Sequence, residues 1–166
     1  MSKIKLVFIN KIIKIEMKNE FVVMYGNNWK NVEGISQTEV DNLEKNVQLK
    51  LPNELKEVIK NCSGSRPSQD FYEGANIEVS IGYILPVKPD KKRGDVLRCY
   101  NRLIETYSFP EHIFPFATDK GHANFICLDL KSKEVVYCLT DVKNNNVRIL
   151  ASDIMSFIYG LSDSVY

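Results

Sequence analysis

The chain has 166 residues, of which 44% are hydrophobic and 26% are charged, and its formal net charge at pH 7 is +1. This length is typical of one ordinary domain with a substantial core. The near-neutral charge excludes a protein-wide basic footprint for nucleic acid and a protein-wide acidic surface that imitates one, so no nucleic-acid partner is expected.

The N-terminal segment carries two conflicting patterns. Residues 13–17 alternate between apolar and charged side chains, and residues 21–25 are rich in β-branched and aromatic side chains, which favours two strands joined by a turn at residues 18–19. Four apolar residues also share one helical face: Ile4, Phe8, Ile12 and Ile15. We expect strands, within an N-terminal extension of residues 1–28 that packs on a domain of residues 29–166, and a helix is the alternative.

The same segment lacks the pattern of a targeting sequence. Its longest run without a charged residue, within the first 17 residues, is Leu6–Asn10. A signal peptide needs a longer apolar run and a small-residue cleavage site, and a transmembrane helix needs about 20 predominantly apolar residues. We therefore expect a cytoplasmic protein with no membrane partner.

Two short helices follow, and both have well-marked ends. Ser36 and Glu39 form the two halves of a capping box, which predicts a helix over residues 36–48. Pro52 suits the first turn of a second helix, and Gly64 lies shortly beyond the end of that helix. The apolar residues at helical spacing are Val40, Leu43, Val47, Leu55, Val58 and Ile59.

The rest of the chain is richer in strands. Residues 63–76, which include Phe71 and Tyr72, are predicted as a long loop, and the alternation over residues 77–85 predicts a half-buried strand. The elements that follow are a helix that begins at Asp95, strands over residues 113–117, 124–130, 135–140 and 147–150, and a helix capped by Ser152. Pro115 favours a sheet edge for the first of these strands.

Consecutive strands without intervening helices argue against a doubly wound fold. We expect an α+β fold, namely a single domain with one mixed, largely antiparallel sheet flanked by helices. The sheet should contain Ile77, Val79, Ile81 and Leu128, and the helices packed on it should carry Leu43, Leu55, Val58 and Phe157. Trp29 should be buried where the N-terminal segment meets the first helix, and an exposed contact with a partner is the alternative.

The four cysteines, Cys62, Cys99, Cys127 and Cys138, are not at Cys-x-x-Cys spacing, and only two histidines accompany them. This is a poor supply of zinc ligands, so we expect reduced structural thiols and neither a metal nor a cofactor. A two-residue turn at residues 132–133 would pair Cys127 with Cys138 across neighbouring strands and would place two free thiols side by side.

Several segments, taken in order, resemble one known family. They are Trp29, Gly34-Ile35-Ser36, Leu51-Pro52, Asn61–Pro67, Phe109–Gly121, Phe125–Asp129 and Ser152–Leu161. Together they span residues 29–162 and are similar to the SUKH superfamily, which includes a fungal regulator of cell-wall synthesis and many bacterial toxin-immunity proteins. The chain departs from the pattern in two places: residues 1–27 have no counterpart, and His122-Ala123 stand where an aspartate after glycine is frequent.

The resemblance implies a non-catalytic α+β domain that binds other proteins. It favours an immunity protein that neutralises a cognate polymorphic toxin by occluding the active site of the toxin domain. A regulatory scaffold in cell-wall or signalling control, closer to the fungal branch, is the alternative. The resemblance names a class of partner, and it does not identify the toxin.

We expect the partner to contact loops, because loops on a rigid scaffold carry recognition and because aromatic residues and arginine are enriched at binding hot spots. The candidate partner-binding residues are Arg66, Phe71, Tyr72, Asp119 and His122. Phe71 and Tyr72 have an equally good alternative role, which is to pin their loop to the core. The basic run at residues 91–93 is interpreted as a solvated loop, with nucleic-acid contact as the minor alternative.

Catalytic candidates are few. His112 and His122 are interpreted as loop histidines. A pair of His122 with Cys127 or Cys138 would lack a third, orienting group at a recognisable spacing. We therefore expect that the protein is not an enzyme.

Three carboxylates have two alternative interpretations in the sequence. Asp119 and Asp129 could be drawn as a catalytic pair, but turn and strand-end hydrogen bonds to the backbone are the favoured interpretation. Glu44, beside the apolar Leu43, is either a partly buried acid that holds two helices together or a surface charge.

Overall fold

The computed structural model describes residues 21–140 and 146–164. Within them the chain forms four helices and two antiparallel sheets, which confirms the predicted α+β class. The helices are α2 (Gln37–Val47), α3 (Asn53–Cys62), α4 (Val96–Glu105) and α5 (Ile154–Tyr159). None of these helices is long and apolar enough to cross a membrane.

Two sheets replace the single sheet predicted from the sequence. The smaller has the strand order β1-β2-β3 and the larger the order β4-β5-β6-β7-β8-β9, and all the pairings are antiparallel. The strands are β1 (Val22–Met24), β2 (Asn27–Lys30), β3 (Arg66–Pro67), β4 (Phe71–Glu73), β5 (Glu78–Ile84), β6 (Ile113–Asp119), β7 (Phe125–Asp129), β8 (Val135–Leu139) and β9 (Asn146–Ala151). The sheets adjoin because Gly64 and Ser65, just before β3, exchange backbone hydrogen bonds with Ile84 of β5.

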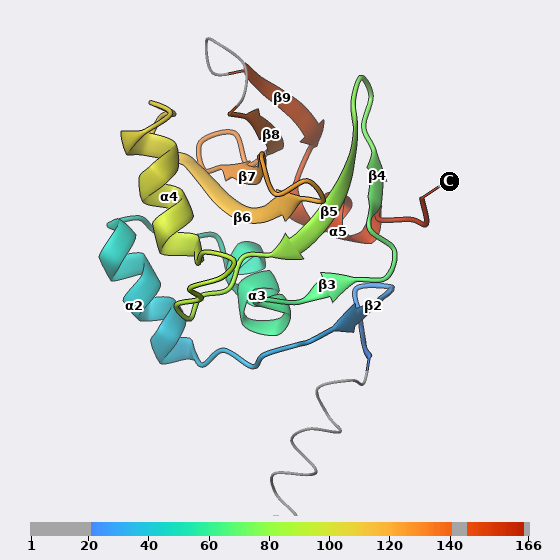
Figure 1. The fold of residues 1–166 in the computed structure, drawn as a ribbon, viewed down its shortest axis with the longest axis horizontal. Helices are drawn as coiled ribbons and strands as arrows, with labels where there is room; N and C mark the ends of the chain where they lie inside the picture. Colours follow the sequence, from blue (N-terminus) through green and yellow to red (C-terminus); the bar gives the residue numbers. More distant parts are fainter. Residues whose placement is uncertain (1–20, 141–145, 165–166) are drawn as a thin grey trace, which may run out of the picture.

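Two helices pack on the larger sheet, α4 against β6 and α5 against β9. Helices α2 and α4 lie side by side, and α4 contacts β6, whereas α3 contacts both α2 and α5 (Figure 1). The C-terminal segment runs along β4, where Phe71 and Ser162 exchange two backbone hydrogen bonds. One edge of the larger sheet is therefore covered by the chain itself, and β9 forms the other edge.

Local capping signals set the helix ends largely as predicted. The Ser36 side chain accepts a hydrogen bond from the Glu39 backbone, and the Glu39 carboxylate accepts one from the Ser36 backbone, which confirms the capping box. The predicted N-cap of α4 is also confirmed. Two details were wrong: Pro52 precedes the first residue of α3, and Asp153 caps α5 in place of Ser152. A carboxylate is the stronger acceptor beside a helix N-terminus.

The predicted loop over residues 63–76 contains two short strands. Strand β3 pairs with β2, and β4 pairs with β5. Elements of two or three residues are too short to show an alternation of apolar and polar side chains. They exist through backbone hydrogen bonds to partners elsewhere in the chain, which the sequence pattern did not predict.

Strand β6 is central, between β5 and β7, so the predicted edge position was wrong. All seven of its residues are buried. The ladder with β7 shifts register between Pro115 and Ala117. Such an irregularity accommodates a residue that has no N–H to donate.

The hairpin of β1 and β2 agrees with the strand pattern predicted for residues 21–25. The alternation at residues 13–17 and the predicted turn at residues 18–19 lie outside the described residues. Tyr25 and Gly26 join the two strands with φ angles of 54° and 70°. Two consecutive left-handed residues form the tight hairpin turn whose twist suits antiparallel strands.

Trp29 of β2 is completely buried, as predicted, and its indole Nε1 donates a hydrogen bond to the Met24 carbonyl at 2.9 Å. The core residues predicted in the helices are also buried, namely Leu43, Leu55, Val58 and Phe157. The prediction that Ile77 lies in the sheet was wrong, because Ile77 lies one residue before β5 and is only half-buried. The apolar side chains that face the sheet therefore form one continuous core.

Glu44 takes the first of its two predicted roles. Its side chain is buried in α2, and Oε1 accepts a hydrogen bond from the backbone N–H of Leu51 at 2.8 Å. The ammonium groups of Lys50 and Lys56 lie 3.8 and 3.7 Å from its carboxylate oxygens. Glu44 therefore holds the connection between α2 and α3.

The predicted pairing of Cys127 with Cys138 was wrong. Cys127 faces Val136 and Cys138 faces Phe125, because the turn between β7 and β8 is two residues longer than predicted. A shift of two residues keeps both cysteines on the same face of the sheet. Both side chains are completely buried, and the Cys138 thiol is close enough to Cys127 to contribute to the raised pKa of the Cys127 thiol, after burial itself.

We expect a thiol reagent to modify almost no cysteine in the native protein and four cysteines after denaturation without reductant. All four are buried as free thiols, and burial raises the pKa of Cys62 to about 12 and that of Cys99 to about 11. Little of the reactive thiolate is then present at neutral pH. A Cys127→Ser variant should give three, and a count of two in the wild-type protein would show a disulfide and contradict the assignment.

Candidate protein-binding surface

Side chains from separate segments meet around Tyr83 of β5. The guanidinium carbons of Arg93 and Arg66 lie 5.2 and 5.8 Å from the centre of the Tyr83 ring. The His122 ring centre lies 5.2 Å from it at an interplanar angle of 44°. Cations over an aromatic face at such distances are attracted to the ring. We name Arg66, Tyr83, Arg93 and His122 the Tyr83 cluster.

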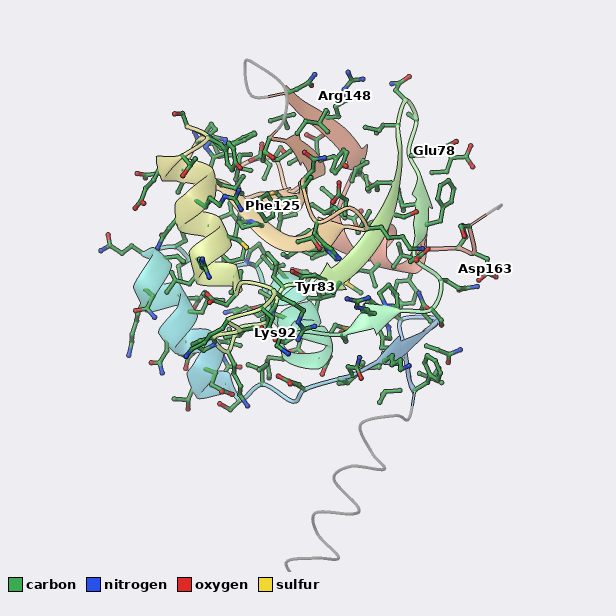
Figure 2. All side chains as sticks on the ribbon, in the orientation of Figure 1. Glu78, Tyr83, Lys92, Phe125, Arg148 and Asp163 are labelled. Carbon is green, nitrogen blue, oxygen red and sulfur yellow. The ribbon has the colours of Figure 1, made fainter. Side chains whose placement is uncertain are left out.

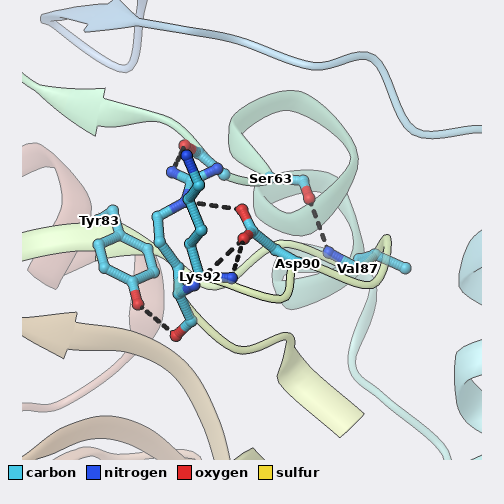
Figure 3. Close-up of polar contacts among 7 residues, drawn as sticks. Ser63, Tyr83, Val87, Asp90 and Lys92 are labelled. Atoms are coloured by element: carbon cyan, nitrogen blue, oxygen red, sulfur yellow. Dashed lines mark hydrogen bonds and ion pairs between the residues drawn. The ribbon is translucent and has the colours of Figure 1, made fainter. Parts of the chain in front are cut away.

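The loop between β5 and α4 positions Arg93 of this cluster. Asp90 accepts hydrogen bonds from the backbone N–H groups of Lys92 and Arg93 at 2.9 and 3.1 Å, and its second oxygen accepts from Arg93 Nε at 2.9 Å (Figure 3). The side-chain hydrogen bond from Arg93, followed by the backbone bonds, lowers the pKa of Asp90. Arg93 also donates from Nη1 to the Gly64 carbonyl at 3.0 Å, which ties the loop to the end of α3.

Tyr83 also fixes the β5–α4 loop through its hydroxyl group. Its hydroxyl donates a hydrogen bond to the Arg93 carbonyl at 2.8 Å, and only 3% of the residue is exposed. Burial raises the pKa of Tyr83, so the phenol stays neutral and continues to donate at physiological pH. A further bond, from the Val87 N–H to the Ser63 hydroxyl at 2.9 Å, fixes the start of the loop (Figure 3). The loop is therefore held at both ends without a partner.

The turn between β6 and β7 positions His122, and buried Asp119 organises this turn. Asp119 Oδ1 accepts hydrogen bonds from the N–H groups of Ala123 and Asn124 at 3.1 and 3.4 Å. Its Oδ2 accepts from the Tyr137 hydroxyl at 2.7 Å and from the Asn124 amide at 3.1 Å. These bonds hold His122 in a left-handed conformation with φ of 57°, which histidine adopts more readily than most residues.

The turn lies very close to β5, and a glycine makes this possible. A Cβ atom on Gly82 would lie 2.5 Å from the Asp119 carbonyl oxygen and 2.9 Å from the His122 ring. Any side chain at this position would therefore push the turn away from the sheet. Gly82 lets His122 reach the face of Tyr83.

Phe71 and Tyr72 lie in β4 and are half-buried. The Tyr72 ring packs on Phe157 of α5 with centres 4.7 Å apart. It also covers Gly160, where a Cβ atom would lie 2.7 Å from Tyr72 Cε2. Tyr72 thus pins its strand to α5, in agreement with the alternative role predicted for it.

The structure brings together two of the five predicted partner-binding residues, because Arg66 and His122 meet on the Tyr83 ring. Asp119 lies beneath the turn that presents His122. Two members of the cluster were missed by sequence reasoning. Arg93 was assigned to a solvated basic run and Tyr83 to a half-buried strand. The Asp90-x-x-Arg93 spacing was the signal that this loop is ordered.

The surface around the cluster is basic. Arg66, Lys91, Lys92 and Lys120 are all exposed there. Lys120 pairs with Asp70 at 2.9 Å and so links the turn to the start of β4. Figure 2 shows Tyr83 and Lys92 near the middle of the view, away from Arg148 of β9 at the top. An acidic partner surface would complement this region.

The two aspartates considered as a catalytic pair do not meet. Asp119 and Asp129 lie at opposite ends of β6 and β7, because Ile113 pairs with Asp129 at one end of this ladder. Asp129 Oδ1 accepts two turn N–H groups and lies 3.9 Å from His112 Nε2. Within residues 21–140 and 146–164, no cluster of three His, Cys, Asp or Glu side chains could hold a metal ion.

The model of one protein family matches residues 34–160 of the chain, and that family is the SMI1/KNR4 family (SUKH-1). The matched residues make up more than half of the chain and include the whole Tyr83 cluster. Strands β1 and β2 precede the matched region. No curated protein matches the chain.

Proposed function

The chain belongs to the SMI1/KNR4 family (SUKH-1), and we propose that it is a non-catalytic protein-binding domain. More specifically, we propose that it is an immunity protein that neutralises a cognate polymorphic toxin by binding the toxin domain directly. The superfamily resemblance supports this role, because many of the bacterial proteins that share its motifs are toxin-immunity proteins. The regulatory scaffold remains the alternative that the experiments below distinguish.

The observation that carries this proposal is the pre-organised Tyr83 cluster. Its residues come from β3, β5, the β5–α4 loop and the β6–β7 turn, and hydrogen bonds within the protein hold the loop and the turn. Residues that are already fixed lose little conformational freedom when a partner binds. Arg66 and His122 are exposed at its surface, and arginine is among the residues enriched at binding hot spots.

We also propose that the protein acts in the cytoplasm. All four of its cysteines are free and buried in the structure. Free thiols persist in reducing compartments, whereas exported proteins commonly form disulfides. A toxin that enters or is made in the cytoplasm would meet the protein there.

Co-expression with the toxin domain encoded by the neighbouring reading frame tests the proposal. We expect the wild-type chain to restore growth and to bind the purified toxin domain. An Arg66→Ala/His122→Ala variant should bind at least tenfold more weakly, since hot-spot residues contribute more than about 1 kcal/mol each. Isothermal titration calorimetry measures the affinity.

Lys131→Ala is the matched control, because Lys131 is exposed in the turn at the other end of β7. It should bind like the wild-type protein. Failure of the chain to bind or neutralise the neighbouring toxin would refute immunity. A specific partner encoded among housekeeping genes would instead support the regulatory scaffold, and unchanged affinity of the double variant would place the interface elsewhere.

A further inference from the structure

A surface pocket of about 310 Å³ lies between the β5–α4 loop and α4. Its lining residues are Lys91, Lys92, Arg93, Gly94, Arg98, Cys99 and Arg102. Five of these seven carry a positive charge, and none carries a negative charge. We name this feature the basic pocket. It adjoins the Tyr83 cluster, because Arg93 belongs to both.

The fold gathers these charges against their mutual repulsion. Arg98 and Arg102 are four residues apart on α4 and therefore lie on one helical face, where like charges destabilise a helix by about 0.2–0.5 kcal/mol. The Asp90 hydrogen bonds then turn residues 91–93 back toward that face. Because the like charges of the basic pocket do not stabilise the fold, they are candidates for binding a ligand of opposite charge.

Several of the charged ends remain available. Arg93 is held by Asp90, and Arg102 donates to the Tyr107 hydroxyl at 2.7 Å. By contrast, no residue of the described part of the chain forms a hydrogen bond or ion pair with the side-chain charges of Lys91, Lys92 and Arg98.

Two carboxylates near the pocket, Asp90 and Asp95, hold backbone groups, whereas Glu105 lines a neighbouring pocket together with Arg98 and Arg102. Asp90 accepts three hydrogen bonds from its own loop, as described above. Asp95 caps α4 by accepting the Arg98 backbone N–H at 3.0 Å. Among the described residues, no carboxylate pairs with the exposed ammonium groups of Lys91 and Lys92, which therefore contact water or another molecule.

We propose that the basic pocket binds an acidic segment, rich in Asp and Glu, on the protein partner; this inference rests on the proposed protein-binding function. Arginine guanidinium groups match carboxylates in a two-pronged geometry. Nucleic acid fits less well, because the net charge of the chain is only +1.

A labelled hexaglutamate peptide tests the pocket directly by fluorescence anisotropy at about 50 mM salt, with hexaglutamine as the uncharged comparison. A Lys92→Gln/Arg98→Gln variant should bind hexaglutamate about tenfold more weakly than the wild-type protein, given the usual size of exposed charge pairs. A Lys131→Gln/Lys133→Gln variant loses the same charge in the β7–β8 turn and should bind within twofold of wild type. Higher salt should weaken wild-type binding.

Thermal unfolding separates binding from folding. The pocket variant should be at least as stable as the wild-type protein, since it relieves repulsion, and a marked loss of stability would show a structural role and overturn the proposal. Equal losses of peptide affinity in the two variants would overturn it as well. So would tighter binding of a hexathymidylate than of hexaglutamate, which would assign the pocket to nucleic acid.

The cognate toxin domain distinguishes this inference from the proposed function. If the pocket variant binds and neutralises the toxin as well as wild type, the inference fails and the immunity function stands. If no toxin is neutralised but the pocket variant still loses hexaglutamate binding, the immunity function fails and the assignment of an acidic ligand stands. Loss of both toxin and peptide affinity in the pocket variant alone would support both.

Discussion

Replacing Asp119 with alanine is expected to lower the free energy of unfolding by about 3–5 kcal/mol. The carboxylate is buried and accepts four hydrogen bonds, from two backbone N–H groups, the Asn124 amide and the Tyr137 hydroxyl. Its loss leaves these donors without their acceptor, and an unsatisfied buried group costs about 1–3 kcal/mol. Urea denaturation followed by the fluorescence of Trp29, the one tryptophan of the chain, measures the change.

Two further variants locate the effect. Tyr137→Phe removes one of the four donors to Asp119 together with an acceptor for the Asn124 amide, and should cost about 1–2 kcal/mol. Asp129→Ala removes an aspartate from the opposite end of the same pair of strands, where its turn bonds are exposed, and should cost about 1 kcal/mol or less. Equal destabilisation by Asp119→Ala and Asp129→Ala would show that the buried network has no special weight.

Leu55→Ala should lower the free energy of unfolding by about 2–5 kcal/mol. Leu55 is completely buried in α3, and shortening it leaves a cavity that the surrounding core fills only in part. The expected measurement is a lower denaturation midpoint with an unchanged slope, which indicates a loss of stability without a change in the unfolded surface.

Glu57→Ala is the control for this position. Glu57 lies in the same helix, and 59% of its side chain is exposed, so its replacement should change stability by less than about 0.5 kcal/mol. An unchanged midpoint for Leu55→Ala would contradict the packing of α3 against the core. The comparison therefore tests burial and not helix propensity.

Some residues of the candidate surface stabilise its fold, and others are exposed for direct contact with a partner. Asp119 and Tyr72 hold the turn and β4 in place, so their loss would affect binding through folding. Arg66 and His122 are exposed on the Tyr83 ring. A loss of affinity from changes at Arg66 and His122, without a loss of stability, would assign a direct contact to them.

Features that depend on neighbouring residues could be predicted from the sequence. The capping box of α2 needs only two side chains three residues apart. The buried positions of Leu43 and Leu55 follow from helical spacing of apolar residues. The family was also predicted correctly, since the order of the short motifs agrees with the match over residues 34–160.

The candidate site was only half predicted. Arg66 and His122 could be predicted because recognition residues are common in loops, although their contacts with Tyr83 could not. Tyr83 and Arg93 were missed, since an aromatic in a strand and an arginine in a basic run look ordinary in the sequence. Tyr83 contacts Arg66 and His122, which lie 17 and 39 positions away, and Arg93 contacts Tyr83 and Gly64, which lie 10 and 29 positions away.

The sequence by itself determined the α+β class, the family, the helices with the N-caps of α2 and α4, and most of the core. Only the tertiary structure decided the second sheet, the central position of β6, the register of Cys127 against Val136 and the meeting of three segments on Tyr83. The reason is physical. A helix satisfies its hydrogen bonds within four residues, so its signals are local. Strand partners and loop contacts join distant residues, and turn length and packing decide which of many pairings form.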